Sequence, residues 1–490
     1  MAVVDSIFGH ARAAPDSLAL VHNGQAWTYR AFAGAIERAR RAFAGQAIGG
    51  GRVAILCLDG PLDGWIAGLA LRSLGVTTVH ARSAEDIERL ALNAACAVTT
   101  AGGAWPELEA AAARADAPLV LAPDDLCANA EPAGEVEPLP STPPPMPPGG
   151  HILLTSGTTG AYKKVLIDTA DEARNTPRRF AMLGLTPTSV IDVFDFGGWT
   201  AIGYQWPVCA WTLGATAVLQ QAPDRYRSLA TPGLTHVLVQ PQLLAELLAA
   251  PADMAPRNDA MALFVGAGVL PLAQWRAARE RLTHDVRNMV GSTETGTIAV
   301  TRIETPEDLA WHQLCDGAGV EVVDEADRPL PPGQAGVVRV RANGVDAYLG
   351  DPEASAAFFR HGCFYPGDLG VLREDGRLSL QGRVTDVINV GGDKIATTPI
   401  ETALQDRLGA EAVCVFSVPG QDGEAVHVAI QTARPVGAAE LKAALLAALP
   451  AVPQARVHAV KAFPRNHLGK IERAALKAQL LGEDTPGGGM

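Results

Sequence analysis

Residues 153–165 read LLTSGTTGAYKKV, and this stretch says most about the fold and the chemistry of the chain. A short apolar run, typical of a buried strand, leads directly into a loop of small and hydroxyl-bearing residues. Two glycines let the backbone approach an anion without a Cβ clash, and backbone N–H groups and hydroxyls act as donors. Lys163 adds a positive charge that suits a polyphosphate. The candidate phosphate-binding residues are Thr155, Ser156, Gly157, Thr158, Thr159, Gly160 and Lys163.

A flexible surface loop rich in Ser, Thr and Gly is the alternative interpretation of this segment. The position of the loop, directly after an apolar strand, favours an anion site. P-loop nucleotidases need a glycine, four residues and then Gly-Lys-Ser/Thr. Here Gly157 is followed by Gly160 and Lys163, so the spacing predicts a phosphate site of another type.

Short apolar runs alternate with helical patterns on both sides of this loop. Strands that alternate with helices indicate an α/β fold of layered parallel sheets and helices. In such sheets ligands bind beyond the carboxyl ends of the strands, so we expect the small-residue turns after these strands to converge on one ligand. A helix is expected at 61–74, and strands are expected at 53–58, 152–154, 237–239, 262–265 and 288–290.

The pattern changes in the last third of the chain. From about Val337 short alternating strands dominate, and past Gly382 a smaller α+β unit begins. We therefore expect a large N-terminal domain over residues 1–383 and a small C-terminal domain over residues 384–490. The Pro-rich segment 138–150 is expected to be an exposed connector.

The composition is that of an ordinary globular protein. Of 490 residues, 48% are hydrophobic and 19% charged, which excludes wholesale disorder. The net charge of −13 argues against nucleic-acid and anionic-membrane partners.

Seven scattered cysteines without a CxxC pair indicate a reduced, cytoplasmic protein with no disulfide framework or zinc site. The longest apolar run, 206–219, falls short of the ~20 residues of a membrane helix, and no signal-peptide pattern is present.

The segment 155–165 resembles the signature Thr-Ser-Gly-Thr-Thr-Gly-x-Pro-Lys-Gly-Val of the AMP-forming adenylating enzymes, with Tyr162 for the proline and Lys164 for the second glycine. This family comprises acyl-CoA synthetases, peptide-synthetase adenylation domains and beetle luciferases. Four further motifs follow in the family's order, so the resemblance spans nearly the whole chain. It implies a large core with a small barrel-like β part, a mobile C-terminal lid, and ATP, Mg²⁺ and CoA as cofactors.

Residues 290–296 read VGSTETG and match the family's Gly-x-Thr-Glu motif. By resemblance, Thr293 touches the α-phosphate of ATP and Glu294 binds Mg²⁺. A carboxylate at the end of a buried strand, beside a phosphate site, is also a reasonable hard-cation ligand on chemical grounds. A helix N-cap followed by an acid in the first turn is the structural alternative. Val290 stands where the family usually has an aromatic residue.

Two more segments carry nucleotide contacts by resemblance. Gly266, Ala267 and Gly268 fit a turn that lines the adenine and acyl pockets, although a tight strand–helix turn looks the same. Asp368, in FYPGDLG, fits the carboxylate that accepts both ribose hydroxyls, with a Pro-Gly-Asp β-turn as the alternative. Arg383 matches the arginine that contacts ribose or phosphate.

The C-terminal region supplies the last two motifs. Gly392 matches the glycine that approaches pantetheine when the small domain rotates about a hinge near Thr385. Residues 464–473, PRNHLGKIER, match Pro-x-Asn-x-x-Gly-Lys-x-x-Arg completely. By resemblance, Lys470 reaches the substrate carboxylate and the α-phosphate during adenylation.

The acyl pocket is expected around the aromatic segment 193–206, VFDFGGWTAIGYQW, near the end of the strand at 237–239. Core packing of the aromatic residues is the alternative. An Asp in this segment binds the substrate amine in amino-acid-activating members, and otherwise it needs local hydrogen bonds because an isolated buried carboxylate is costly. The candidate substrate-pocket residues are Asp195, Trp199, Tyr204, Gln240 and Val290.

These motifs indicate ATP-dependent activation of a carboxylic acid as its acyl-adenylate, release of pyrophosphate, and transfer of the acyl group to a thiol, with CoA as the expected acceptor. One alternative is a stand-alone adenylation enzyme that loads an amino or aryl acid onto a separate phosphopantetheinyl carrier protein. A catalytically degenerate nucleotide-binding protein is a third interpretation.

Overall fold

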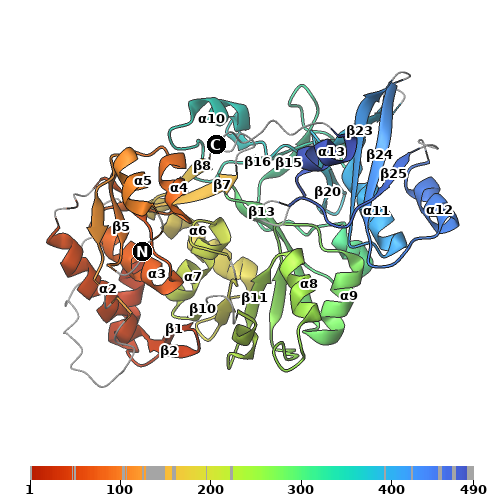
Figure 1. Ribbon diagram of the computed structural model, residues 1–490. Helices are drawn as coiled ribbons and strands as arrows, with labels where there is room; N and C mark the ends of the chain where they lie inside the picture. Colours follow the sequence, from red (N-terminus) through yellow and green to blue (C-terminus); the bar gives the residue numbers. More distant parts are fainter. Residues whose placement is uncertain are drawn as a thin grey trace.

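Two large sheets and their helices form most of the molecule, and a smaller α/β unit lies at the opposite end from the N-terminal helices (Figure 1). The computed structural model describes residues 3–46, 48, 51–101, 105, 107–123, 126–127, 149–156, 162–194, 196–220, 225–390, 393–420, 423–450, 455–465 and 471–482. Most of the Pro-rich segment 138–150 therefore lies outside the described residues.

The first sheet has eight strands in the order β14-β13-β12-β11-β9-β10-β1-β2. Its inner strands pair in parallel, and each edge is an antiparallel hairpin. The strands are β1 (Leu18–His22), β2 (Gln25–Thr28), β9 (Val190–Asp192), β10 (Thr216–Leu219), β11 (His236–Val239), β12 (Ala262–Val265), β13 (Asp285–Ser292) and β14 (Gly296–Arg302).

The second sheet has six strands in the order β6-β5-β3-β4-β7-β8. All its pairs are parallel except the terminal hairpin of β7 with β8. The strands are β3 (Val53–Leu56), β4 (Thr77–His80), β5 (Ala94–Thr99), β6 (Leu119–Leu121), β7 (His151–Ser156) and β8 (Tyr162–Ile167).

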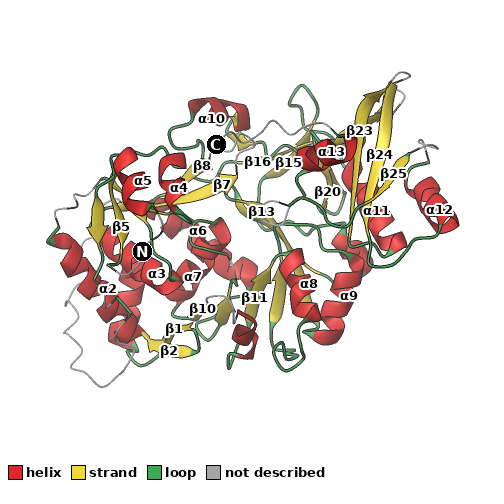
Figure 2. Ribbon diagram, in the orientation of Figure 1, coloured by secondary structure: helices red, strands yellow, loops and turns green. Residues whose placement is uncertain are grey.

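Helices fill the space between the two sheets and cover their outer faces. The largest hydrophobic cluster joins both sheets through α1 (Val3–Ala13), α2 (Tyr29–Ala44), α3 (Pro61–Ser73) and α7 (Ala201–Leu213). The outer face of the eight-stranded sheet packs on α8 (Pro241–Ala249) and α9 (Leu272–Arg281), and that of the six-stranded sheet on α4 (Ala84–Arg89) and α5 (Leu108–Arg114). The result is a five-layered α/β arrangement, in which helices and strands alternate as in Figure 2.

The sequence explains these elements locally. Strands such as β11 (HVLV) and β12 (ALFV) are buried along their whole length, because helices cover both faces of a parallel sheet. Helix α6 (Thr169–Leu183) begins where the Asp168 carboxylate accepts a 2.7 Å bond from the Asp171 N–H. It ends at Gly184, whose positive φ of 72° suits glycine.

The third region is a small β part followed by the C-terminal unit. The β part contains β15 (Val320–Val323), β16 (Ala335–Arg341), β17 (Phe359–Arg360), β18 (Cys363–Phe364), β19 (Asp368–Leu372) and β20 (Leu378–Arg383), with α10 (Pro352–Phe358). The C-terminal unit contains β21 (Val387–Val390), β22 (Asp393–Ala396), β23 (Ala412–Gly420), β24 (Gly423–Gln431) and β25 (Arg456–Ala459), with α11 (Thr397–Leu408), α12 (Ala438–Ala448) and α13 (Arg473–Leu481).

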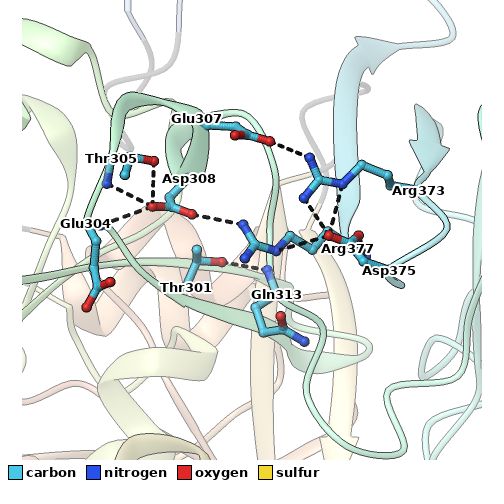
Figure 3. Close-up of polar contacts among 9 residues, drawn as sticks. All are labelled: Thr301, Glu304, Thr305, Glu307, Asp308, Gln313, Arg373, Asp375 and Arg377. Carbon is cyan, nitrogen blue, oxygen red and sulfur yellow. Dashed lines mark hydrogen bonds and ion pairs between the residues drawn. The ribbon is translucent and has the colours of Figure 1, made fainter.

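A polar network ties the small β part to the segment after β14 (Figure 3). The short helix η2 (Pro306–Leu309) begins with a capping box in which Asp308 accepts a 2.9 Å bond from the Thr305 N–H. Asp308 also pairs at 2.9 Å with Arg377, the residue before β20. Arg373 pairs with Asp375, in the turn between β19 and β20, and also with Glu307 of η2. These contacts fix the β part against the edge of the eight-stranded sheet.

The predicted fold class is confirmed: the chain is a layered α/β protein with a large N-terminal part and a small C-terminal part. The apolar run 206–219 is the end of α7 and strand β10, both buried. Among the described residues, every helix is too short or too polar to cross a bilayer. The division at 383/384 stays a prediction; it falls between the end of β20 and the start of β21.

Candidate functional site

The predicted phosphate loop begins in β7 and ends in β8, two strands that pair as an antiparallel hairpin. The register pairs Thr155 with Lys163 and Ser156 with Tyr162. Gly157, Thr158, Thr159 and Gly160 lie outside the described residues, as does the Ser156 side chain. The hairpin nevertheless places Lys163 beside the strand end at Thr155.

Lys163 lies between aromatic rings and carboxylates. Its Nζ is 3.4 Å from the ring centroid of Phe358 and 5.2 Å from that of Tyr348. Burial lowers the pKa of Lys163, and the nearby Glu294 and Asp351 carboxylates partly oppose this shift. The ammonium group is therefore partly removed from water and placed close to Glu294.

Glu294 lies in the turn between β13 and β14, directly after Thr293. Its side chain is buried, and its Oε1 accepts a 2.7 Å hydrogen bond from the Tyr348 hydroxyl. Burial and the Glu294 charge raise the pKa of Tyr348, which keeps the hydroxyl a donor. A single held carboxylate suits Mg²⁺, which proteins bind through one or two carboxylates together with substrate phosphates.

The strand ends converge as the sequence predicts. Because β11, β12 and β13 are parallel neighbours, Gln240, Gly266 and Thr293 come to the same edge of the eight-stranded sheet. A Cβ on Gly266 would meet Met289 and Leu238 in van der Waals contact, so this glycine lies packed between the two flanking strands. Ala267 and Gly268 are exposed, and Ala267 holds a positive φ of 62° that non-glycine residues rarely adopt.

The two predicted ribose contacts face each other across a β-ladder. Asp368 begins β19 and is the register partner of Arg383 at the end of β20. The Arg383 Nε lies 3.1 Å from the Asp368 Oδ1. The Arg383 side chain is half exposed and also donates to the Pro366 carbonyl. The structure therefore brings these two residues together, next to the predicted hinge.

Two predicted substrate-pocket residues pack toward the six-stranded sheet. Tyr204 is 2% exposed, stacks on His151 at 4.2 Å between ring centroids, and donates a 2.5 Å bond to the Glu172 Oε2. Trp199 packs against the cluster that includes the apolar residues of β7, and its carbonyl accepts a 2.8 Å bond from the Leu154 N–H. Their role in substrate binding stays a prediction.

The other substrate-pocket predictions have different surroundings. Gln240 caps the N-terminus of α8 without a side-chain cap bond. Val290 packs with the apolar cluster of the small β part. Asp195 lies outside the described residues.

Lys470 and Gly392 also lie outside the described residues, but the arginine of the same C-terminal motif is described. Arg473 pairs with Asp386 at 3.1 Å and with Glu401 at 2.7 Å. It thereby joins the start of α13 to α11 and to the predicted hinge segment, where Asp386 follows Thr385.

A cavity of about 1040 Å³ opens beside Thr293 and Glu294. Its walls are one face of α6, strand β14 and two segments of the small β part, residues 313–318 and 340–345. Arginines are prominent in its lining: Arg178, Arg179, Arg287, Arg302 and Arg341.

The family model for "AMP-binding enzyme" matches residues 7–346, more than half of the chain. The chain belongs to the AMP-binding enzyme family. The matched region of this AMP-binding enzyme contains Lys163, Thr293 and Glu294, and it ends just before Tyr348.

Named relatives agree with this assignment. The chain is 30% identical over 364 residues to a salicyl-AMP ligase/salicyl-S-ArCP synthetase of Mycobacterium tuberculosis, which covers 69% of this chain and 62% of the relative. It is 29% identical over 506 residues to a probable non-canonical nonribosomal peptide synthetase of Salinispora arenicola, covering 95% of this chain and 6% of that protein. The AMP-binding enzyme thus spans only part of the length of these relatives.

A solved structure shares the whole fold. The o-succinylbenzoate CoA synthetase of Bacillus subtilis, in complex with an acyl-adenylate intermediate, matches with a TM-score of 0.80 at 21% identity over 99% of each chain. At this identity the likeness establishes the fold of the AMP-binding enzyme.

Sequence reasoning missed Tyr348 and Arg179. Tyr348 is 54 positions from the Glu294 that it contacts. Arg179 lies on α6, where a charged residue on an amphipathic helix is ordinary. Only the tertiary packing brings Tyr348 to Glu294 and places Arg179 at the cavity beside it.

Proposed function

We propose that this AMP-binding enzyme activates a carboxylic acid with ATP as an acyl-adenylate and then transfers the acyl group to a thiol, with CoA as the acceptor. The observation that carries the proposal is the meeting of Lys163 and Glu294 beside Tyr348, at the end of the β7–β8 hairpin. A cation and a held carboxylate beside a turn of small, hydroxyl-bearing residues suit a nucleotide triphosphate and its metal.

The first step joins two anions. A carboxylate oxygen of the acid attacks the α-phosphorus of ATP, and the bond from that phosphorus to the bridging oxygen breaks, so that pyrophosphate leaves. The Lys163 ammonium stabilises the charge that develops on the leaving group. Thr293 is assigned to the α-phosphate and Lys470 to the carboxylate and α-phosphate. Mg²⁺, when held by Glu294, supplies charge neutralisation on the phosphate oxygens.

The second step replaces AMP by sulfur. A thiolate attacks the acyl carbon, the bond from that carbon to the phosphate oxygen breaks, and AMP leaves. We assign Asp368 to the ribose and Arg383 to the ribose or a phosphate. Gly266–Gly268 are assigned to the adenine and acyl pockets, and Gly392 to the approach of pantetheine after rotation of the C-terminal unit. A cytoplasmic setting belongs to the same proposal and agrees with seven free cysteines.

A carrier protein is the second candidate acceptor. The name of the M. tuberculosis relative, salicyl-S-ArCP synthetase, favours a separate carrier protein, whereas the name of the B. subtilis neighbour favours CoA. Mass spectrometry of the thioester, formed with CoA or with a phosphopantetheinylated carrier protein, distinguishes these acceptors.

The test of the activation step is acid-dependent exchange of pyrophosphate into ATP across aliphatic, aryl and amino acids. We expect exchange with at least one acid, and a loss of about a hundredfold or more in Glu294→Gln, because metal-assisted charge stabilisation contributes several kcal/mol. Glu325→Gln, at an exposed position on the small β part, is the matched control. Absence of exchange with every acid, or equal exchange in Glu294→Gln and the control, would refute the proposal.

A further inference from the structure

The cavity beside Glu294 is positively charged, although the chain as a whole carries −13. Five arginines line it against three acidic side chains, Asp171, Glu294 and Asp316. Two of the acids already have partners, since Asp171 pairs with Arg174 and Glu294 accepts from Tyr348. Of the three acids, only the exposed Asp316 has no side-chain hydrogen bond or ion pair to another described residue. The acidic side chains of the lining therefore do not neutralise its positive charge.

The spacing of residues along helix α6 places its two arginines at the cavity. Asp171, Asn175, Arg178 and Met182 follow one another at spacings of three and four residues, and Arg179 lies four residues after Asn175 and three before Met182, so all five lie on one side of the helix. Near the start of this face, Asn175 contacts Asn343 of the opposite wall through a 2.8 Å hydrogen bond. The next helical turn carries both arginines, so they face the space between α6, β14 and the small β part.

Three of the five guanidinium groups have no ion-pair partner. The side chains of Arg178, Arg179 and Arg341 make no hydrogen bond or ion pair with any residue that the structure describes. In contrast, Arg287 and Arg302 share Asp285, at 2.7 Å and 3.5 Å. Guanidinium groups present a planar set of donors that matches phosphate oxygens.

Arg179 lies deepest of the three. A Cβ placed on Gly296 would lie 3.7 Å from the Arg179 Nη2, so this guanidinium reaches the β13–β14 turn that also carries Glu294. Burial lowers the pKa of Arg179. The Glu172 charge opposes this shift only in part, and Glu172 is already bonded to Tyr204 and Arg72. A bound anion would supply the charge that the protein does not.

We propose that the wall of this cavity built from Arg178, Arg179 and Arg341 is a binding site for a phosphate-type polyanion, separate from the edge of the cavity at Thr293 and Glu294 that is assigned to ATP. The ligand class is a compact molecule with two or more phosphoryl charges. Two sources fit this chemistry: free pyrophosphate and the bisphosphate end of a nucleotide such as CoA. The inference does not rest on the proposed function, because binding is measured without acid or turnover.

The test is calorimetric titration of the full chain with pyrophosphate and, separately, with adenosine 3′,5′-bisphosphate, at low salt and with saturating AMP present. We expect at least one probe to bind. Arg179→Gln and Arg341→Gln are each expected to lower its affinity about tenfold, as for loss of a charge-assisted hydrogen bond. Arg407→Gln, an exposed arginine on α11, is the matched control and should bind as the unmodified chain does.

The outcomes separate the possibilities. Binding of pyrophosphate alone identifies an inorganic ligand, and binding of the bisphosphate alone identifies a nucleotide ligand. The proposal is overturned if neither probe binds, or if all variants bind equally. It is also overturned if Arg341→Gln weakens ATP binding as much as probe binding, because the arginines would then belong to the nucleotide site. Arg341 lies on an exposed strand end, so this variant tests the proposal even if Arg179→Gln fails to fold.

Discussion

Helix α6 carries two charges that have different partners. Near its start, the buried Glu172 meets the Arg72 Nη1 at 3.1 Å and the Tyr204 hydroxyl at 2.5 Å. Arg179 follows seven residues later, on nearly the same side of the helix. Its side chain has no hydrogen bond or ion pair within the described chain and lines a cavity of about 1040 Å³. The same helix therefore holds a paired buried charge and, two turns later, an unpaired one beside open space.

The difference separates a structural role from a binding role. A buried ion pair satisfies its own charges and stabilises the packing of the helices that carry it. A half-buried cation without a partner is unfavourable for folding by itself, and its presence indicates a ligand. The following experiments test whether the Glu172 pair and the unpaired Arg179 differ in this way.

The largest effect is expected from Glu172→Gln. This change leaves the Arg72 guanidinium, 1% exposed, without a counter-charge, and breaking a buried pair costs about 3–5 kcal/mol. Urea unfolding followed by tryptophan fluorescence measures the loss, because Trp65 stacks on Tyr204 with a 5.4 Å separation of ring centroids.

The control for this change is Glu88→Gln, which removes one partner of an exposed ion pair with Arg114. We expect no clear change in its unfolding midpoint. The double change Arg72→Met with Glu172→Leu should recover much of the lost stability, since it removes both charges. A Glu172→Gln protein as stable as the Glu88→Gln control would contradict a structural role for the pair.

A second prediction concerns Glu294, the cavity acid that a tyrosine hydroxyl holds. Tyr348→Phe removes the 2.7 Å hydrogen bond to Glu294 while keeping the ring beside Lys163. We expect pyrophosphate exchange to fall about tenfold, as for loss of a group that orients a metal ligand, with about 1 kcal/mol or less lost in unfolding free energy. Tyr226→Phe, at a partly buried tyrosine away from the cavity, is the control. Unchanged exchange would show that Tyr348 does not position Glu294.

Loss of the Arg179 charge should affect the unfolding free energy differently from loss of the Glu172 charge. Arg179→Met removes a cation that lacks a partner, so the unfolding free energy without ligand should change by less than about 1 kcal/mol or increase. The measurement is the same urea titration, with and without pyrophosphate. A loss as large as that of Glu172→Gln would mean that Arg179 is part of the packed interior.

The smallest expected effect is the pH dependence of stability that comes from His80, which contacts Tyr204 through the His151 ring. His80 lies between Gly64 and Gly198, and burial lowers its pKa to about 4. Because the unfolded chain binds protons more readily near the ordinary value of 6.5, stability should fall as the pH drops from about 6.5 toward 4. His80→Gln should reduce this slope of urea midpoint against pH, whereas the exposed His284→Gln should not. An equal slope in both variants would show that His80 does not stay neutral in the folded protein.

Much of the fold follows from local sequence patterns. The apolar runs at 237–239 and 262–265 are β11 and β12, and the helical spacing at 61–74 is α3. The expected strand at 152–154 likewise lies within β7. These features depend on neighbours in the chain or on the parallel order of strands, which periodicity can indicate.

The surroundings of individual buried side chains do not follow from the sequence pattern. The aromatic segment 193–206 is consistent with both a substrate pocket and core packing, and Tyr204 packs on His151 and Glu172. The side chain of Val290 lies on the face of β13 that packs against the small β part. A single-residue change of strand face moves a side chain to the other side of a sheet, and the motif spacing does not report which face is covered.

The sequence alone determined the layered α/β fold and the membership of the AMP-binding enzyme family, because both depend on periodicity and on short conserved-spacing motifs read along the chain. The tertiary structure alone decided which charges are neutralised. Glu172 and Arg179 lie seven residues apart on one helix, and only the packing of α3, α7 and β14 around it gives one a partner and leaves the other facing a cavity. Electrostatic compensation depends on distances between segments remote in sequence, which no local pattern contains.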